Sequence, residues 1–309
     1  PRRAWRPPRA RPPRRAPTLA AGPRRRADGS LGDGAILPIE LLGENRSPTM
    51  TAITVRREGT VEVLTMNRPE RLNALDPPAM KELRLALQKA ALDLSVRAVL
   101  LTGSGSAFCA GGDVAVMDDH RKGGTLPELF HELTGEQELC VREIVAMKKP
   151  VVAALPGVAA GGGLSLALAS DWRIASESAT LLPAFPTLGA VPDGGLTYFL
   201  PHYLGLGLAQ EVLFTNARLT ATRGRELGLL HEVCAPGELE SRSLDRAREL
   251  ADGPTFSYGW TKHLLENAFH GSLEEQLALE RRGAVEAARG SELPEGIRAF
   301  REKRKPKFH

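Results

Sequence analysis

Two glycine-rich segments of the chain could bring backbone amide groups to a ligand. Residues 107–113 read AFCAGGD and follow an apolar run, and residues 157–170 read GVAAGGGLSLALAS and lead into a helix. Glycine lacks a Cβ atom, so the backbone at residues 161–163 can approach a ligand closely, and the N-terminus of the helix favours negative charge. These amides therefore suit an oxygen atom that becomes negatively charged during a reaction. Close packing of the helix against a strand is the alternative explanation of the same glycines.

Asp193 stands in the segment VPDGG at 191–195, after the second glycine-rich segment. Pro192 restricts the backbone before Asp193, and the two glycines allow the next helix to begin tightly, so the carboxylate can face a pocket. The alternative is that Asp193 only caps a helix over 194–203.

Other residue patterns that carry chemistry are incomplete or absent in the sequence. Gly103 and Gly105 lack the third glycine of a dinucleotide-binding loop, and there is no G-x-x-x-x-G-K-[ST], G-x-S-x-G or H-E-x-x-H. His231 and Cys234 could form half of a metal site, but no second pair lies nearby in the sequence, which favours a structural role for His231. We therefore predict no metal site and no redox cofactor.

The spacing of apolar residues predicts strands and helices that alternate. Two short strands are expected within 52–66, and 96–103 and 151–157 are apolar runs typical of strands buried on both faces. Asp76 is the predicted N-cap of a helix over 77–92, because Pro77 and an apolar stripe follow it. Further elements are a strand over 172–176 and helices over 127–147, 194–203, 207–215 and 221–228. The pattern predicts an α/β fold with at least part of the sheet parallel.

The positive charge of the chain is concentrated in an N-terminal extension. The 309 residues have a net charge of +4, and residues 1–49 contain eleven Arg, four acidic and nine Pro residues. This composition buries too little apolar surface to fold, so we expect a disordered extension, with a basic binding arm as the alternative. The remaining residues have a net charge of −3, which argues against a nucleic-acid partner. We predict a core over 50–248 and a charged helical segment over 249–309.

Several motifs, in order along the chain, resemble the enoyl-CoA hydratase/isomerase, or crotonase, superfamily. The segments that carry the resemblance are NRPERLNAL (67–75), AFCAGGD (107–113), KKPVVAALPGVAAGGG (148–163), PTLGAVPDGGLTYFLPHYLG (186–205) and EGIRAFREKRKPKF (295–308). The resemblance implies a crotonase-like spiral of ββα units, a C-terminal helical segment that builds a homotrimer or a dimer of trimers, and an acyl-CoA thioester as substrate. Coenzyme A is part of that substrate, so no separate cofactor is expected.

The resemblance also implies which residues form the site. In the superfamily, two backbone N–H groups bind the thioester oxygen as it becomes an enolate, and the matching motif positions are Ala110 and Gly162. Arg71 lies where the family contacts the nucleotide end of CoA, and a solvated loop residue is the alternative. The channel for CoA and the thioester would be lined by four consecutive residues, Ala110, Gly111, Gly112 and Asp113.

The chain departs from the hydratases of the superfamily at their two catalytic glutamates. The corresponding positions are Ser165 and Phe185, and neither side chain can act as a carboxylate base. Asp193 lies in a segment similar to the L-x-P-D-x-G motif of the isomerase branch, where an aspartate moves protons. At the position that the resemblance implies, Phe185 would make the pocket apolar, and burial there would raise the pKa of Asp193 into a range useful for proton transfer. We therefore expect isomerisation of an enoyl-CoA with Asp193 as the acid–base group. The alternatives are a thioester hydrolase, a residual hydratase, or a catalytically silent acyl-CoA-binding member. Ser165 either donates a hydrogen bond or packs in the core.

The location of the protein is predicted from its thiols and its extension. The three cysteines form no C-x-x-C pair, which suits a reducing cytoplasm, and no run of 18 apolar residues predicts a membrane span. The mitochondrial matrix is the alternative if the Arg-rich extension is a presequence, although its prolines and acidic residues argue against that.

Overall fold

The computed structural model describes residues 51–308 of the chain. The predicted N-terminal extension over 1–49 lies outside the described residues. Within the described part, no helix is long and apolar enough to cross a membrane.

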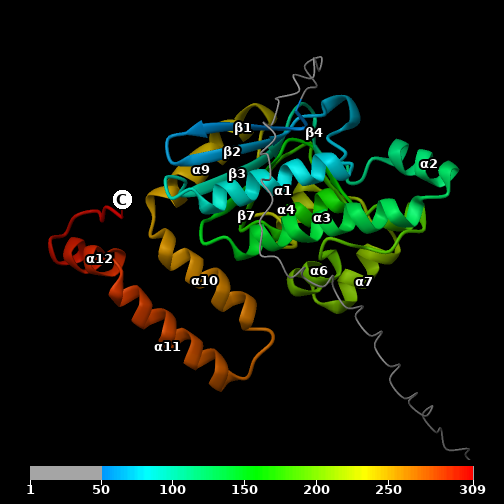
Figure 1. Ribbon diagram of the computed structural model, residues 1–309. Coiled ribbons are helices and arrows are strands. Elements are labelled where there is room, and N and C mark those ends of the chain that lie inside the picture. Colours follow the sequence, from blue (N-terminus) through cyan, green and yellow to red (C-terminus); the bar gives the residue numbers. More distant parts are fainter. Residues whose placement is uncertain (1–50, 309) are drawn as a thin grey trace, which may run out of the picture. The chain divides into compact units, whose positions relative to one another are not determined.

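A six-stranded sheet forms the centre of the fold (Figure 1), with the strand order β1-β2-β3-β5-β7-β10. Its strands are β1 (Ile53–Glu58), β2 (Val61–Met66), β3 (Ala98–Gly103), β5 (Val151–Leu155), β7 (Trp172–Ser176) and β10 (Glu232–Cys234). β1 and β2 pair antiparallel, as expected of a hairpin, and every other neighbouring pair is parallel. The predicted parallel sheet is therefore confirmed.

A second, smaller sheet contains strands that follow those of the large sheet along the chain. It has the order β4-β6-β8-β9, with β4 (Ala107–Cys109), β6 (Val158–Ala160), β8 (Thr180–Leu182) and β9 (Leu219–Thr220). Each of β3, β5 and β7 is followed by a short strand and then a helix, namely α2 (Val114–Gly123), α4 (Gly162–Ala169) and α5 (Phe185–Leu188). This repeat is the expected spiral of ββα units. It brings three strand-to-helix loops to one end of the small sheet.

The helices agree closely with the apolar spacing. The carboxylate of Asp76 accepts a hydrogen bond from Ala79 N at 2.9 Å and caps α1 (Pro77–Leu92). α1 packs along α3 (Leu126–Ala146), within one residue of the predicted helix over 127–147 at each end. The predicted helices over 194–203, 207–215 and 221–228 correspond to α6 (Leu196–Leu204), α7 (Leu206–Phe214) and α8 (Ala221–Glu226). The short helices α2 and α5 were not expected.

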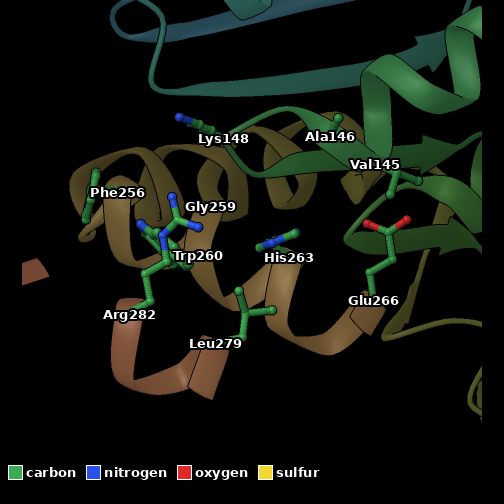
Figure 2. Close-up of a pocket in the computed structure, with 10 residues that line it drawn as sticks. All are labelled: Val145, Ala146, Lys148, Phe256, Gly259, Trp260, His263, Glu266, Leu279 and Arg282. Atoms are coloured by element: carbon green, nitrogen blue, oxygen red, sulfur yellow. The ribbon is translucent and has the colours of Figure 1, made fainter. Parts of the chain in front are cut away.

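The C-terminal region is helical, as predicted, but it is not separated from the core at residue 248. That boundary falls inside α9 (Leu239–Asp252), and α9 packs on β3, β5 and β7. Three further helices follow: α10 (Thr255–Asn267), α11 (Leu273–Arg289) and α12 (Glu292–Arg301). A hollow of about 360 Å³ lies between the end of α3 and the helices α10 and α11, and Figure 2 shows Trp260, His263 and Arg282 around it.

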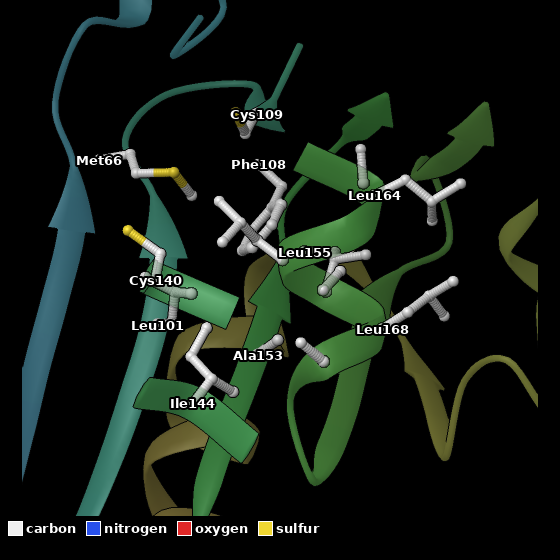
Figure 3. Close-up of a cluster of buried hydrophobic side chains, with 14 of the residues drawn as sticks. Met66, Leu101, Phe108, Cys109, Cys140, Ile144, Ala153, Leu155, Leu164 and Leu168 are labelled. Atoms are coloured by element: carbon white, nitrogen blue, oxygen red, sulfur yellow. The ribbon is translucent and has the colours of Figure 1, made fainter. Parts of the chain in front are cut away.

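Side chains alternate between the two faces along each strand of the large sheet, and helices cover both faces, so both are buried. On β3, Val99 and Leu101 contribute to the core beneath α1, α3 and α4, whereas Ala98 and Leu100 face α9. Figure 3 shows the first of these cores, where Leu101, Phe108 and Ile144 meet. All three side chains are inaccessible to solvent. The loops after β4 and β6 are therefore anchored to the buried core.

Candidate active site

A cavity of about 260 Å³ lies where the two glycine-rich loops meet α3 and the loop before α6. Five of the predicted site residues line it and so come together in space: Ala110, Gly111, Gly112, Gly162 and Asp193. The rest of its wall is largely apolar and includes Met117, Phe130, Leu133, Phe185 and Leu188. The larger hollow beside α10 contains none of the predicted site residues. The smaller cavity is therefore the candidate active site.

The loop after β4 presents a different amide from the one that the motif predicted. Ala110 N donates to Leu72 O at 3.0 Å, so this N–H group is already used. Leu75 pairs with the loop by donating to Gly111 O at 2.8 Å and by accepting from Asp113 N at 3.1 Å. The N–H group of Gly112 lies between them and donates to no backbone oxygen within residues 51–308. The assignment of the donor to Ala110 is therefore wrong, although Ala110 does line the cavity.

The second loop presents Gly162 at the first position of α4. Gly161 has a φ of +51° and donates to Leu182 O at 3.0 Å, which fixes the turn into the helix. Gly162 N donates to no backbone oxygen in the described part of the chain, as expected of the first turn of a helix. The two loops are close: a Cβ atom at Gly111 would lie only 3.3 Å from Gly162 N. The amide groups of Gly112 and Gly162 thus belong to one small region of the cavity wall.

Asp193 does not cap a helix. The N-cap of α6 is Gly195, and no side chain caps that helix. Asp193 Oδ1 is buried and has no hydrogen-bond partner within residues 51–308. Burial raises the pKa of Asp193 from its ordinary value of 3.8 to about 6, and the side-chain amide of Gln137 opposes this shift. The carboxyl group is therefore close to the point at which it can both accept and return a proton at neutral pH.

The two residues that depart from the hydratase pattern both contribute to the surroundings of Asp193. Ser165 is fully buried in α4, and its hydroxyl donates to Asp193 O at 3.0 Å. Both alternatives for Ser165, a hydrogen-bond donor and a core residue, therefore hold. Phe185 is 8% exposed and lines the cavity beside Asp193. Its ring contributes to the apolar surroundings that were expected to desolvate the carboxyl group.

Asp113 and Arg71 lie outside the cavity wall. The Asp113 carboxylate is buried, accepts from Ala115 N at 3.0 Å to cap α2, and forms ion pairs with Arg71 at 2.6 Å and Arg68 at 3.3 Å. Burial alone would raise the pKa of Asp113, but the hydrogen bonds from Arg71 and Ala115 outweigh it and lower the pKa. Asp113 is therefore not part of this cavity wall, and its place along a CoA channel stays a prediction. It anchors the loop that carries Gly112, and Arg71 is a half-exposed partner in that anchor.

His231 has a structural role, as its isolation in the sequence suggested. Its Nδ1 accepts from Arg173 N at 3.1 Å, and its ring stacks on Trp172 with 4.4 Å between the centroids. Burial and the nearby Arg173 lower the pKa of His231 to about 4, so the ring is neutral at physiological pH.

Two polar residues of the cavity, Gln137 and Thr187, were missed by the sequence analysis. Gln137 of α3 lines the cavity, and its side chain is buried. The signal was present in the sequence, because Gln137 stands four residues after Leu133 in a stripe that is otherwise apolar or cysteine.

Comparison with known proteins finds relatives that are similar in both fold and sequence. The chain resembles the crystal structure of an enoyl-CoA hydratase from Polaromonas sp. JS666, with a TM-score of 0.79 and 35% identity over 83% of this chain and 99% of that one. It is 37% identical to the 1,2-epoxyphenylacetyl-CoA isomerase of Escherichia coli (strain K12), over 81% of this chain and 95% of the relative. A probable enoyl-CoA hydratase from Rhodobacter capsulatus is 36% identical over 84% of this chain and 99% of its own length.

The fold is that of the crotonase enzymes, in which ββα units form a spiral. The enoyl-CoA hydratase/isomerase family model matches residues 56–309, and the chain belongs to this family. The family resemblance inferred from the motifs is thereby confirmed. Its members among these relatives are named both as isomerases and as hydratases.

Proposed function

We propose that the protein moves the double bond of an enoyl-CoA thioester, with Asp193 as the acid–base group. The observation that carries this proposal is the Asp193 carboxyl group, which lines an apolar cavity and has a pKa raised to about 6. Relatives named 1,2-epoxyphenylacetyl-CoA isomerase and, in Streptococcus mutans, trans-2-decenoyl-[acyl-carrier-protein] isomerase support an isomerase reaction.

The proposed reaction needs one carboxylate. Ionised Asp193 removes a proton from the carbon between the thioester carbonyl and the double bond of a 3-enoyl-CoA. The electron pair of the broken C–H bond moves to the carbonyl oxygen, which gives a dienolate. The protonated carboxyl group then returns the proton two carbons further along, which leaves a 2-enoyl-CoA. A pKa near 6 suits both steps, because the group must be a base first and an acid afterwards.

The negative oxygen of the dienolate would be bound by the N–H groups of Gly112 and Gly162. Both residues line the cavity, and neither N–H donates to a backbone oxygen in residues 51–308. Fixed donors of this kind contribute about 3 kcal/mol each to the stabilisation of a developing oxyanion. Because Ala110 N is already bonded to Leu72 O, we replace the predicted donor with Gly112.

The acyl group would be apolar. Met117, Phe130 and Leu133 line the cavity on the side of α2 and α3, and Phe185 and Leu188 line it from α5. These side chains exclude water from the reacting carbon, which favours proton return over hydration.

A homotrimer or dimer of trimers remains part of the proposal. Large apolar side chains are exposed along the C-terminal helices and the turn between α10 and α11, among them Phe269 (65%), Leu277 (54%) and Phe300 (86%). Exposed apolar surface of this kind is typical of a face that another subunit covers.

The proposal is tested by incubating the purified full chain with 3-enoyl-CoA and 2-enoyl-CoA esters of several chain lengths. Isomerisation, hydration and release of free CoA thiol are followed in the same samples. We expect isomerisation of 3-enoyl-CoA to exceed the other two reactions. Predominant hydration of 2-enoyl-CoA would favour the hydratase alternative, and thiol release would favour the hydrolase alternative. Binding of the esters without any reaction would indicate a silent member of the family.

A further inference from the structure

The side-chain amide of Gln137 is placed where packing alone would select an apolar group. The buried residues of α3 are Leu129, Leu133, Gln137, Cys140 and Ile144, and the Gln137 side chain is only 3% exposed. A buried amide without a partner is unfavourable relative to an apolar side chain of the same shape. Its position on this face therefore needs a reason other than packing.

Two glycines leave room for this amide. A Cβ atom at Gly162 would lie 2.6 Å from Gln137 Oε1, and a Cβ atom at Gly194 would overlap with Gln137 Nε2. Gly194 also has a φ of +57°, a conformation that glycine adopts without strain. The amide is thus held between the start of α4 and the residue that follows Asp193.

The unpaired atoms of Gln137 and Asp193 are complementary. Gln137 Nε2 is a donor and Asp193 Oδ1 is an acceptor, and both are buried without a hydrogen-bond partner within residues 51–308. Both residues line the same cavity. The Gln137 amide also lies close enough to lower the pKa of Asp193 against the larger effect of burial.

The other elements around Asp193 provide no competing group. The Ser165 hydroxyl on α4 donates to the backbone oxygen of Asp193, and the Thr187 hydroxyl oxygen on α5 accepts from Asn216 Nδ2 at 2.7 Å. The neighbouring Met117 of α2 and Phe185 of α5 are apolar. No charged side chain of the described residues contributes to the shift of the Asp193 pKa. Gln137 is thus the side-chain donor that the structure offers to this carboxylate.

We infer that Gln137 is a positioning residue for Asp193: its Nε2 donates a hydrogen bond to the ionised carboxylate and holds it toward the substrate carbon. This inference rests on the proposed isomerase function for its role in catalysis, but the hydrogen bond itself does not depend on activity. When the carboxyl group takes up the substrate proton, the bond to the amide weakens, which allows the proton to be delivered to the second carbon.

The first test measures the titration of Asp193 in the full chain, without substrate. Protein labelled with carbon-13 at the aspartate carboxyl groups is titrated by NMR, and the Asp193→Asn variant identifies the signal. We expect a midpoint near 6 in the wild type. Replacing the donor in Gln137→Met should raise it by about half a pH unit or more. A midpoint that stays within the error of the wild-type value would overturn the inference.

Two further variants serve as a control and as a replacement for Gln137→Met if that variant does not fold. Gln88→Met is the matched control, because Gln88 is a partly buried glutamine on α1 that bonds to Arg84 and Glu143, outside the cavity. It should leave the Asp193 midpoint unchanged. If Gln137→Met does not fold, Gln137→Glu has nearly the same shape and should raise the midpoint by about one unit or more, because a second carboxyl group repels the first. An unchanged midpoint in Gln137→Glu would contradict the inference.

The second test uses the enoyl-CoA assay. In Gln137→Met we expect kcat to fall about tenfold with KM within about twofold, because positioning affects the reacting state more than binding. The acidic limb of the pH profile should move upward with the NMR midpoint. If the wild type shows no isomerisation but Gln137→Met raises the Asp193 midpoint as expected, the proposed function is rejected and the hydrogen bond between Gln137 and Asp193 is retained. If isomerisation requires Asp193 but neither readout responds to Gln137, only the role of Gln137 is rejected.

Discussion

Ser165 donates a hydrogen bond of 3.0 Å to the backbone oxygen of Asp193, across 28 positions of the sequence. The donor comes from the first helical turns after the triple glycine, and the acceptor comes from the loop before α6. This contact ties the loop that carries the proposed acid–base group to the helix that carries Gly162. Ser165 stands at the position of a glutamate in the hydratase pattern, and its hydroxyl fixes the backbone of Asp193.

Ser165→Ala should lower both stability and turnover. The loss of one buried hydrogen bond costs about 1 kcal/mol, and a less fixed Asp193 should lower kcat several-fold. Ser170→Ala is the matched control, because Ser170 is also buried and donates to Leu166 O at 3.1 Å, away from the cavity. It should lose similar stability in urea unfolding but keep its kcat. Equal kcat losses in the two variants would argue against a specific role for Ser165.

Asp193→Asn should stabilise the protein at neutral pH. The folded-state pKa of about 6 exceeds the ordinary value of 3.8, so the wild type loses stability as pH rises from about 4 to above 6. The total loss is at most about 3 kcal/mol, and a neutral amide avoids it. Urea unfolding of both proteins across this pH range should show a difference that grows with pH.

The control for this prediction is Asp118→Asn. Asp118 is exposed, and its hydrogen bonds with Lys122 and Arg121 lower its pKa. Its replacement should therefore give no stabilisation as pH rises. If Asp193→Asn behaves in the same way as Asp118→Asn, the carboxyl group of Asp193 is not desolvated.

The amide protons of Gly112 and Gly162 should respond to an enolate-like ligand, whereas that of Ala110 should not. Hydrogen bonding to a negative oxygen shifts an amide proton downfield, and Ala110 N is already bonded to Leu72 O. The measurement is an amide NMR spectrum of the full chain with and without a CoA thioester analogue that carries a stable enolate-like group. A shift at Ala110 with none at Gly112 would restore the donor that the motif predicted.

Lys262 should stabilise the packing of α10 against the core, because its ammonium group bonds to α3 and to Asp171. Its Nζ donates to Asp171 Oδ2 and to Ile144 O, each at 2.8 Å. Lys262→Met leaves the partly buried Asp171 without its cation. We expect a loss of about 2–3 kcal/mol in urea unfolding, because a partly desolvated charge without its partner is costly. The double variant with Asp171→Asn should lose less than the single one. Additive losses would mean that the pair contributes no coupling energy.

The sequence predicted the large elements because each has a strong local signal. Asp76 and Pro77 define the start of α1, and the apolar runs at 96–103 and 151–157 correspond to β3 and β5. The small sheet was missed because its strands have only two or three residues, which is too short for a periodic pattern. The expected break at 248 was wrong because α9 buries Ala247 and Ala251 against the large sheet.

The site was predicted in part. The segment that contains Gly162 was identified from its glycines, and Asp193 was identified from the resemblance to the isomerase motif. The choice between Ala110 and Gly112 depends on which amide is already bonded to the neighbouring chain. The backbone groups of Leu72 and Leu75 form hydrogen bonds with this loop and occupy the Ala110 amide but not the Gly112 amide. Such backbone pairing between distant segments does not depend on residue type, so the sequence does not reveal it. Gln137 was missed for a related reason, since its partner lies 56 positions away and only the fold brings them together.

The central claim is that one carboxylate, Asp193, moves the proton. The most direct measurement compares isomerisation of a 3-enoyl-CoA by the full chain and by Asp193→Asn, together with the affinity of each for a CoA ester. We predict a fall in kcat of about a thousandfold with the affinity unchanged within about twofold, because the amide keeps the shape but cannot accept the proton. An Asp193→Asn variant that retains isomerisation within about tenfold of the wild type would contradict this account.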